Sequence, residues 1–118
     1  MNFIVFPGQG SQKIGMGKNL SENFYEAKEV FDEVNDALNF NLTKIMWEGS
    51  DSEISLTTNA QPALMACGVA AFRVLSKLKD KNLKQLADFT CGHSLGDYTA
   101  MTVAQVFSLK ECAILLRL

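Results

Sequence analysis

The sequence of 118 residues predicts an α/β fold, a partial parallel sheet with helices on both faces. Two short, largely apolar β-prone runs, 2–6 and 86–91, each lead into a glycine-containing turn. Around them, apolar residues recur at spacings of three and four, as in amphipathic helices. A first run that is apolar on both faces is typical of a covered parallel strand. Since two strands make a small core, we expect this helix-rich chain to be the front portion of a larger domain.

Composition and charge exclude several classes of function. With 47% apolar and 20% charged residues, the chain matches a folded globular domain. Its formal charge of −2 and scattered basic residues argue against a nucleic-acid partner. No basic leader precedes the first strand and no apolar run could span a bilayer, so we expect a cytoplasmic protein without a membrane partner. We expect Cys67, Cys91 and Cys112 to be buried free thiols, and a single histidine predicts no metal site.

The first strand, 2–6, is followed by a loop, 7–17, that contains four glycines. Such a density of glycine indicates tight turns or close approach of backbone to a ligand. Neither nucleotide-binding pattern fits, because Lys13 stands where a dinucleotide motif needs its third glycine and Met16 where a Walker A motif needs lysine. We therefore expect the loop to shape a pocket at the end of the strand, without a nucleotide.

Helices are predicted for most of the next stretch. An amphipathic helix begins with Ser21 as its N-cap and ends at Asn39, which tolerates a left-handed backbone. A short helix follows over 42–47 and ends at Gly49, and the polar residues 50–58 are predicted to form a loop.

The longest predicted helix begins at its N-cap Asn59 and runs to Leu78, with Pro62 tolerated in its first turn. It is apolar almost all round, so we place it in the core. A last helix is capped by Ser108 and remains apolar to Leu118. We expect that apolar end to be exposed and to favour self-association.

The segment Gly92-His93-Ser94-Leu95-Gly96 matches the G-x-S-x-G nucleophile elbow. A strand is predicted before it, over 86–91, and a helix after it, over 97–106. In such an elbow the serine sits at a strained strand-to-helix turn, which needs neighbours without bulk and directs helix N–H groups at the same place. The alternative is an ordinary turn with an exposed serine.

A serine nucleophile needs a neighbouring general base. The only histidine, His93, is adjacent to Ser94 and projects in a different direction, so it orients a bound group or fills space. A pairing of Ser94 with Lys13 would need a lowered lysine pKa. The base is therefore absent or lies beyond Leu118, and we expect this chain alone to be catalytically incomplete.

Four motifs, in order and spacing, resemble malonyl-CoA:acyl carrier protein transacylases and the related acyltransferase domains of polyketide and fatty-acid synthases. The motifs are Pro7-Gly8-Gln9-Gly10-Ser11-Gln12, Gly15-Met16-Gly17, Gln61-Pro62-Ala63-Leu64 and Gly92-His93-Ser94-Leu95-Gly96-Asp97-Tyr98. The resemblance spans 1–118 and implies the N-terminal part of one acyltransferase domain with an α/β-hydrolase-like core. The ferredoxin-like subdomain and C-terminal part of that family would be absent.

The resemblance implies an S-malonyltransferase of fatty-acid biosynthesis that uses no cofactor. Its substrates would be malonyl-CoA and the phosphopantetheine thiol of acyl carrier protein, with an acyl intermediate on Ser94. Backbone N–H groups of Gln12 and Leu95 would form the oxyanion hole. The residues expected to bind the substrate are His93, Gln61 and Gly10.

Departures from the family pattern are few. Asp97 replaces the usual glutamate, and Gln105 stands where glycine commonly follows the elbow helix, so we expect strain at that exit. The family's carboxylate-binding arginine would fall just after Leu118, and we interpret Arg117 as a surface or interface residue. Two alternatives stay open: a serine hydrolase of the esterase type that uses the same elbow, and a non-catalytic binding or assembly module.

Overall fold

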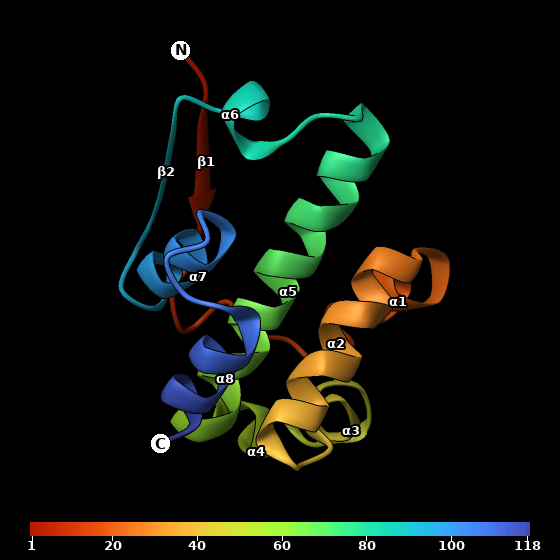
Figure 1. The fold of residues 1–118 in the computed structure, drawn as a ribbon. Helices are drawn as coiled ribbons and strands as arrows, with labels where there is room; N and C mark the ends of the chain where they lie inside the picture. The colour runs from red at the N-terminus through yellow and green to blue at the C-terminus, as the bar shows by residue number, and fades with distance from the viewer.

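The computed structural model describes all residues, 1–118, and confirms an α/β fold with a parallel two-stranded sheet (Figure 1). Strands β1 (Phe3–Phe6) and β2 (Phe89–Gly92) pair in the register Phe3 to Phe89 and Phe6 to Gly92. Because the strands are parallel, the loops that follow Phe6 and Gly92 leave the sheet at the same edge. At this edge the glycine-rich loop, 7–17, and the elbow around Ser94 lie next to each other.

Helix α5 is the centre of the helical body, and it packs against α2, α7 and α8 (Figure 1). Its buried residues include Ala63, Met65 and Ala66, which confirms the predicted core helix. The helices are α1 (Lys18–Asn23), α2 (Tyr25–Leu38), α3 (Leu42–Glu48), α4 (Asp51–Ser55), α5 (Thr57–Lys79), α6 (Leu83–Leu86), α7 (Leu95–Val103) and α8 (Leu109–Arg117). None of them combines the length and apolar character needed to cross a membrane.

The helix predicted from Ser21 to Asn39 is two helices. Ser21 lies inside α1 and is not an N-cap, because α1 begins at Lys18 with Gly17 as its N-cap. The chain then breaks at Phe24, where φ is −135° and ψ is 123°. The extended backbone at Phe24 lets its ring pack on the core while α2 takes a new direction. Asn39 ends α2 with φ 48° and ψ 43°, the left-handed conformation predicted for it.

The predicted loop over 50–58 is wrong. Ser50 and Glu53 form a reciprocal capping box that starts α4, and α5 begins at Thr57 with Leu56 as its N-cap. Asn59 is therefore inside α5, where it is buried and donates from Nδ2 to the Glu53 carbonyl at 2.9 Å. Residues 55–59, which we call the α4–α5 corner, are held compactly by this bond.

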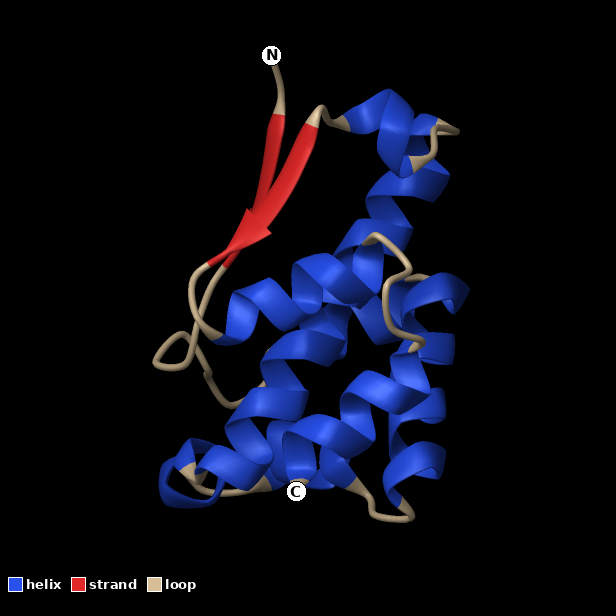
Figure 2. Cartoon of the chain, turned by 60° about the vertical axis from the view of Figure 1, so that its left-hand side comes forward, coloured by secondary structure: helices blue, strands red, loops and turns tan.

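Helices were predicted on both faces of the sheet, but they cover only one face (Figure 2). Phe6 is buried on the helical side, whereas Phe3 and Val5 on the opposite side are 58% and 66% exposed. The Phe3 ring stacks on Phe89 with centroids 5.5 Å apart. The second strand is also shorter than predicted, because Leu86 belongs to α6.

The C-terminal helix α8 is less exposed than predicted. Its capping box of Ser108 and Glu111 confirms the predicted start. Contrary to the expectation of an exposed apolar end, one face of α8 packs on α2 and α5, and the buried residues are Leu109, Cys112, Ala113 and Leu116. The exposed apolar side chains of this end are Ile114, Leu115 and Leu118.

The three cysteines are free, as predicted, but they are not all buried. Cys112 is buried, Cys67 is half-buried and Cys91 is exposed on the open face of the sheet. Burial raises the pKa of the Cys67 thiol to about 12. Cys91 is exposed because strand residues alternate between faces and the face that carries Cys91 has no helix over it.

Candidate active site

Ser94 occupies a sharp turn between β2 and α7. Its φ of 56° and ψ of −109° place a non-glycine residue in a costly backbone conformation. The turn is held by the N–H of His93 donating to the Phe6 carbonyl at 3.2 Å and the N–H of Gly96 donating to the His93 carbonyl at 3.0 Å. The Ser94 side chain is exposed and makes no capping hydrogen bond, so Oγ is available to a substrate.

The two glycines of the elbow are required by close packing of backbone. A Cβ added at Gly92 would overlap the backbone of Gly96. A Cβ added at Gly96 would overlap the carbonyl oxygen of Phe6 and lie 3.1 Å from that of Pro7. The elbow is therefore pressed against the end of β1, which accounts for the glycine spacing around Ser94.

The start of α7 offers a hydrogen-bond donor next to the serine. Leu95 is the first residue of α7, so its N–H has no carbonyl one turn earlier to bind. Its side chain is buried and anchors this turn in the core. A free N–H beside Ser94 is what an oxyanion hole needs, and the role of Leu95 stays a prediction.

The glycine-rich loop touches the elbow at Gly8. A Cβ at Gly8 would lie 2.5 Å from the His93 carbonyl oxygen and 3.2 Å from its imidazole Nδ1. His93 is thus packed against the loop. Gly10, with φ 113°, has open space around it and donates its N–H to Gln12 Oε1 at 2.7 Å.

The loop is also anchored to the α4–α5 corner. Gln9 Nε2 donates to Thr57 Oγ1 at 3.1 Å, and Gln12 Nε2 reaches Ser55 Oγ at 3.5 Å. Gln61 Nε2 approaches Gln9 Oε1 at 3.5 Å, which places Gln61 beside the loop. Ser55 and Thr57 were not predicted to contribute, because their segment was interpreted as a loop without structure of its own.

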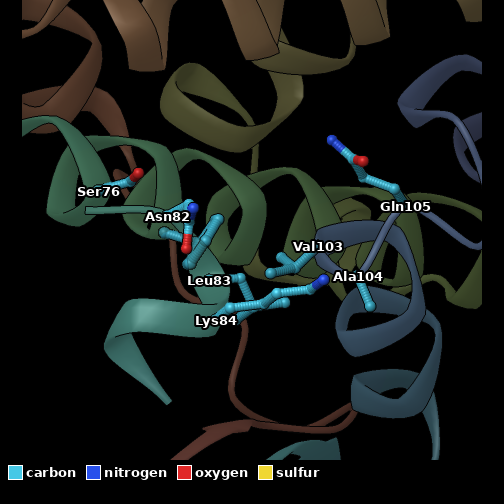
Figure 3. A pocket seen from close by; sticks show the side chains of 8 residues that line it. Ser76, Asn82, Leu83, Lys84, Val103, Ala104 and Gln105 are labelled. Atoms are coloured by element: carbon cyan, nitrogen blue, oxygen red, sulfur yellow. The ribbon is translucent and has the colours of Figure 1, made fainter. Parts of the chain in front are cut away.

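The exit of the elbow helix differs from an ordinary helix end. Gln105 has φ 65°, which confirms the strain predicted there. It lines a cavity of about 430 Å³ between α5, α6 and α7, together with Ser76, Lys84 and others (Figure 3). None of the predicted site residues lines this cavity, and Ser94 is exposed outside it.

Comparison with known proteins decides the family. The acyl transferase domain pattern matches residues 3–118. This chain belongs to the acyl transferase domain family. The chain is 45% identical over 114 residues to malonyl CoA-acyl carrier protein transacylase of Bacillus subtilis (strain 168), and 36% identical to that of Staphylococcus aureus (strain COL). The matches cover 97% of this chain but 34% and 35% of those relatives, so the chain spans about a third of their length.

Solved structures of acyl transferases superpose closely on the chain. The acyl-carrier-protein-S-malonyltransferase of Bartonella henselae matches with a TM-score of 0.95 and 50% identity, over 99% of this chain and 37% of that one. A type II PKS acyl-carrier protein in complex with its malonyl-transacylase matches with a TM-score of 0.88 and 36% identity, over the same shares. The α/β arrangement of this chain is therefore that of the family.

Proposed function

We propose that this chain takes part in transferring a malonyl group from coenzyme A to the phosphopantetheine thiol of acyl carrier protein, in fatty-acid biosynthesis. The strained backbone of Ser94 at the strand-to-helix turn carries the proposal, because it presents Oγ without a competing bond. The relatives named malonyl CoA-acyl carrier protein transacylase support the malonyl group as cargo. The transacylase bound to its acyl-carrier protein supports the partner.

The reaction would proceed in two acyl transfers. Ser94 Oγ attacks the thioester carbonyl of malonyl-CoA, the C–S bond breaks, and coenzyme A leaves as its thiol. The phosphopantetheine thiol then attacks the seryl ester, the C–O bond breaks, and Ser94 regains its proton. The N–H groups of Gln12 and Leu95 would donate to the carbonyl oxygen as it becomes negative in both steps. No cofactor is needed.

His93, Gln61 and Gly10 would bind the acyl group and its carrier. The packing of His93 against Gly8 supports this role, because it directs the imidazole toward the loop. Deprotonation of Ser94 would then fall to a base outside these 118 residues, so the chain alone is proposed to be catalytically incomplete. A cytoplasmic location is part of the proposal, and the three free thiols support it, since they persist in a reducing compartment.

Intact mass spectrometry after incubation with malonyl-CoA tests the proposal. We expect at most one malonyl adduct per chain, mapped to Ser94, without multiple turnover. Ser94→Ala should abolish the adduct, whereas Ser11→Ala, which removes an exposed loop hydroxyl, should retain it. Repeated turnover of the thioester would contradict the catalytic incompleteness of the chain.

The same samples separate the alternatives. Turnover of a simple p-nitrophenyl ester, lost in Ser94→Ala, would favour a serine hydrolase. Absence of both an adduct and ester turnover would favour a binding or assembly module. We also propose limited self-association through the side chains of α8 that remain exposed, which sedimentation velocity would detect as a dimer.

A further inference from the structure

Helix α5 contains a missing hydrogen bond close to the candidate site. Pro62 lies inside α5 and has no N–H, so the carbonyl four residues earlier, that of Thr58, cannot receive its helical bond. Arg117 Nη1 donates to this carbonyl at 3.0 Å. A side chain from the end of α8 thus supplies the donor that proline removes from α5.

Two further contacts fix the position of the Arg117 guanidinium. The same Nη1 donates to Asn59 Oδ1 at 2.6 Å, and the guanidinium carbon lies 3.8 Å from the centroid of the Phe40 ring. Stacking on an aromatic ring stabilises a guanidinium and limits its motion. Arg117 is half-buried, and the sequence did not indicate the contacts that it makes with α5 and Phe40.

The bonds continue from Asn59 toward the glycine-rich loop. Asn59 is 5% exposed and donates to the Glu53 carbonyl at 2.9 Å, which ties the end of α4 to the start of α5. The corner between them carries Ser55 and Thr57, the hydroxyls that accept from Gln12 and Gln9. We call Arg117, Thr58 and Asn59 the arginine latch.

We propose that Arg117 is a positioning residue for the acyl-transfer site, and that the arginine latch fixes the α4–α5 corner so that the loop presents the Gln12 N–H to the substrate. The proposal rests on the proposed function of Ser94. Arg117 touches neither Ser94 nor the loop, and it acts through Asn59 and the corner. Since a misplacement of about 1 Å can cost about 100-fold in rate, loosening of this corner should be visible in acylation.

The first test measures the order of the glycine-rich loop directly, by hydrogen exchange. The Gly10 N–H is bonded to Gln12 Oε1, so its hydrogen exchange, followed by NMR, reports the order of the Gln12 side chain. We expect Arg117→Ala to speed this exchange about 10-fold under conditions where amides of α2 keep their rates. Lys110→Ala, which removes an exposed cation from the same helix, should leave it unchanged. Unchanged Gly10 exchange in Arg117→Ala, or acceleration of all amides alike, would overturn the proposal.

The second test uses Pro62. Substitution Pro62→Ala restores an N–H at position 62 that can bond to the Thr58 carbonyl, so it should weaken the dependence on Arg117. We expect Arg117→Ala to lower the rate constant of Ser94 acylation by malonyl-CoA about 10-fold or more in the natural background, and by a smaller factor in the Pro62→Ala background. If Arg117→Ala lowered the acylation rate constant by equal factors in the two backgrounds, the proposed role of the arginine latch would be wrong.

These outcomes separate the latch from the proposed function. If Ser94 of the unsubstituted chain is not acylated, the proposed function fails, while Gly10 exchange still decides whether the latch orders the loop. If Arg117→Ala does not fold, Arg117→Lys retains the stem and the charge but loses the planar fork. We then expect about 3-fold faster Gly10 exchange in Arg117→Lys, and no change would overturn the proposal.

Discussion

The contact between the elbow and β1 predicts that Gly96→Ala is damaging although alanine favours helices. Gly96 is in the first turn of α7 and has no positive φ, so alanine should gain about 1 kcal/mol in helix propensity. Its Cβ would overlap the Phe6 carbonyl oxygen and lie 2.9 Å from the Phe6 carbonyl carbon. Backbone at the end of a paired strand cannot rotate away. Forced overpacking of this kind costs up to about 3 kcal/mol, which leaves a net loss of about 2 kcal/mol.

Urea unfolding followed by circular dichroism measures this loss, and Gly68→Ala is the matched control. A Cβ at Gly68 would lie 2.6 Å from Thr99 Cγ2 and 3.0 Å from Phe6 Cδ1, which are side-chain atoms and not backbone. We expect Gly68→Ala to change the free energy of unfolding by less than about 1 kcal/mol, because helix propensity offsets the contact. A loss below about 0.5 kcal/mol for Gly96→Ala, or an equal loss for Gly68→Ala, would refute the backbone contact as the cause.

Three further predictions concern local features. Gln105→Gly should stabilise the chain by up to about 1 kcal/mol in urea unfolding, because glycine relieves the positive φ at a small entropic cost. Iodoacetamide at pH 8 should alkylate exposed Cys91 much faster than Cys67, as peptide mass mapping would show. Because burial raises the pKa of Cys67 from 9.0 to about 12, the unfolded state loses this proton first. The free energy of unfolding should therefore fall by up to about 1.4 kcal/mol per pH unit from pH 9 toward 12.

Each of these predictions has its own control. Gln105→Ala removes the same side chain but keeps the strain, so an equal stabilisation would show that the backbone is not responsible. Faster alkylation of Cys67 than of Cys91 would contradict the burial of Cys67. In Cys67→Ala the alkaline slope should flatten, and a slope that does not change would assign the effect to other groups.

Much of the fold could be predicted because its signals are local. The left-handed end at Asn39, the helix end at Gly49 and the cap at Ser108 each depend on one residue type in one backbone conformation. The elbow was predictable for the same reason, since glycines two residues to either side of Ser94 are typical of a strained strand-to-helix turn. The two strands were predicted from two short apolar runs, but the exposure of one face of the sheet was not predicted.

The predictions failed where contacts between residues far apart in the sequence determine the structure. The break at Phe24 leaves the apolar spacing of the helix intact, so periodicity continues across it. The polar composition of 50–58 concealed α4, although the capping pair of Ser50 and Glu53 was present in the sequence. Nothing near Arg117 indicates a partner 59 residues away. The available signal was Pro62, because a proline within a helix leaves a carbonyl that some donor must satisfy.

The pairing of β1 with β2 sets the order in which the site can be assembled during synthesis. Asn2 and Asp88, which are hydrogen-bonded beside the paired strands, are 86 residues apart in the chain. A ribosome adds about 5–20 residues per second, so β1 waits several seconds as an unpaired apolar segment before its partner is made. During that interval the glycine-rich loop exists without the serine that it will face. Ser94 is thus placed against the loop in one step that follows the synthesis of β2, and a chain stalled before β2 carries an open strand edge available to other chains.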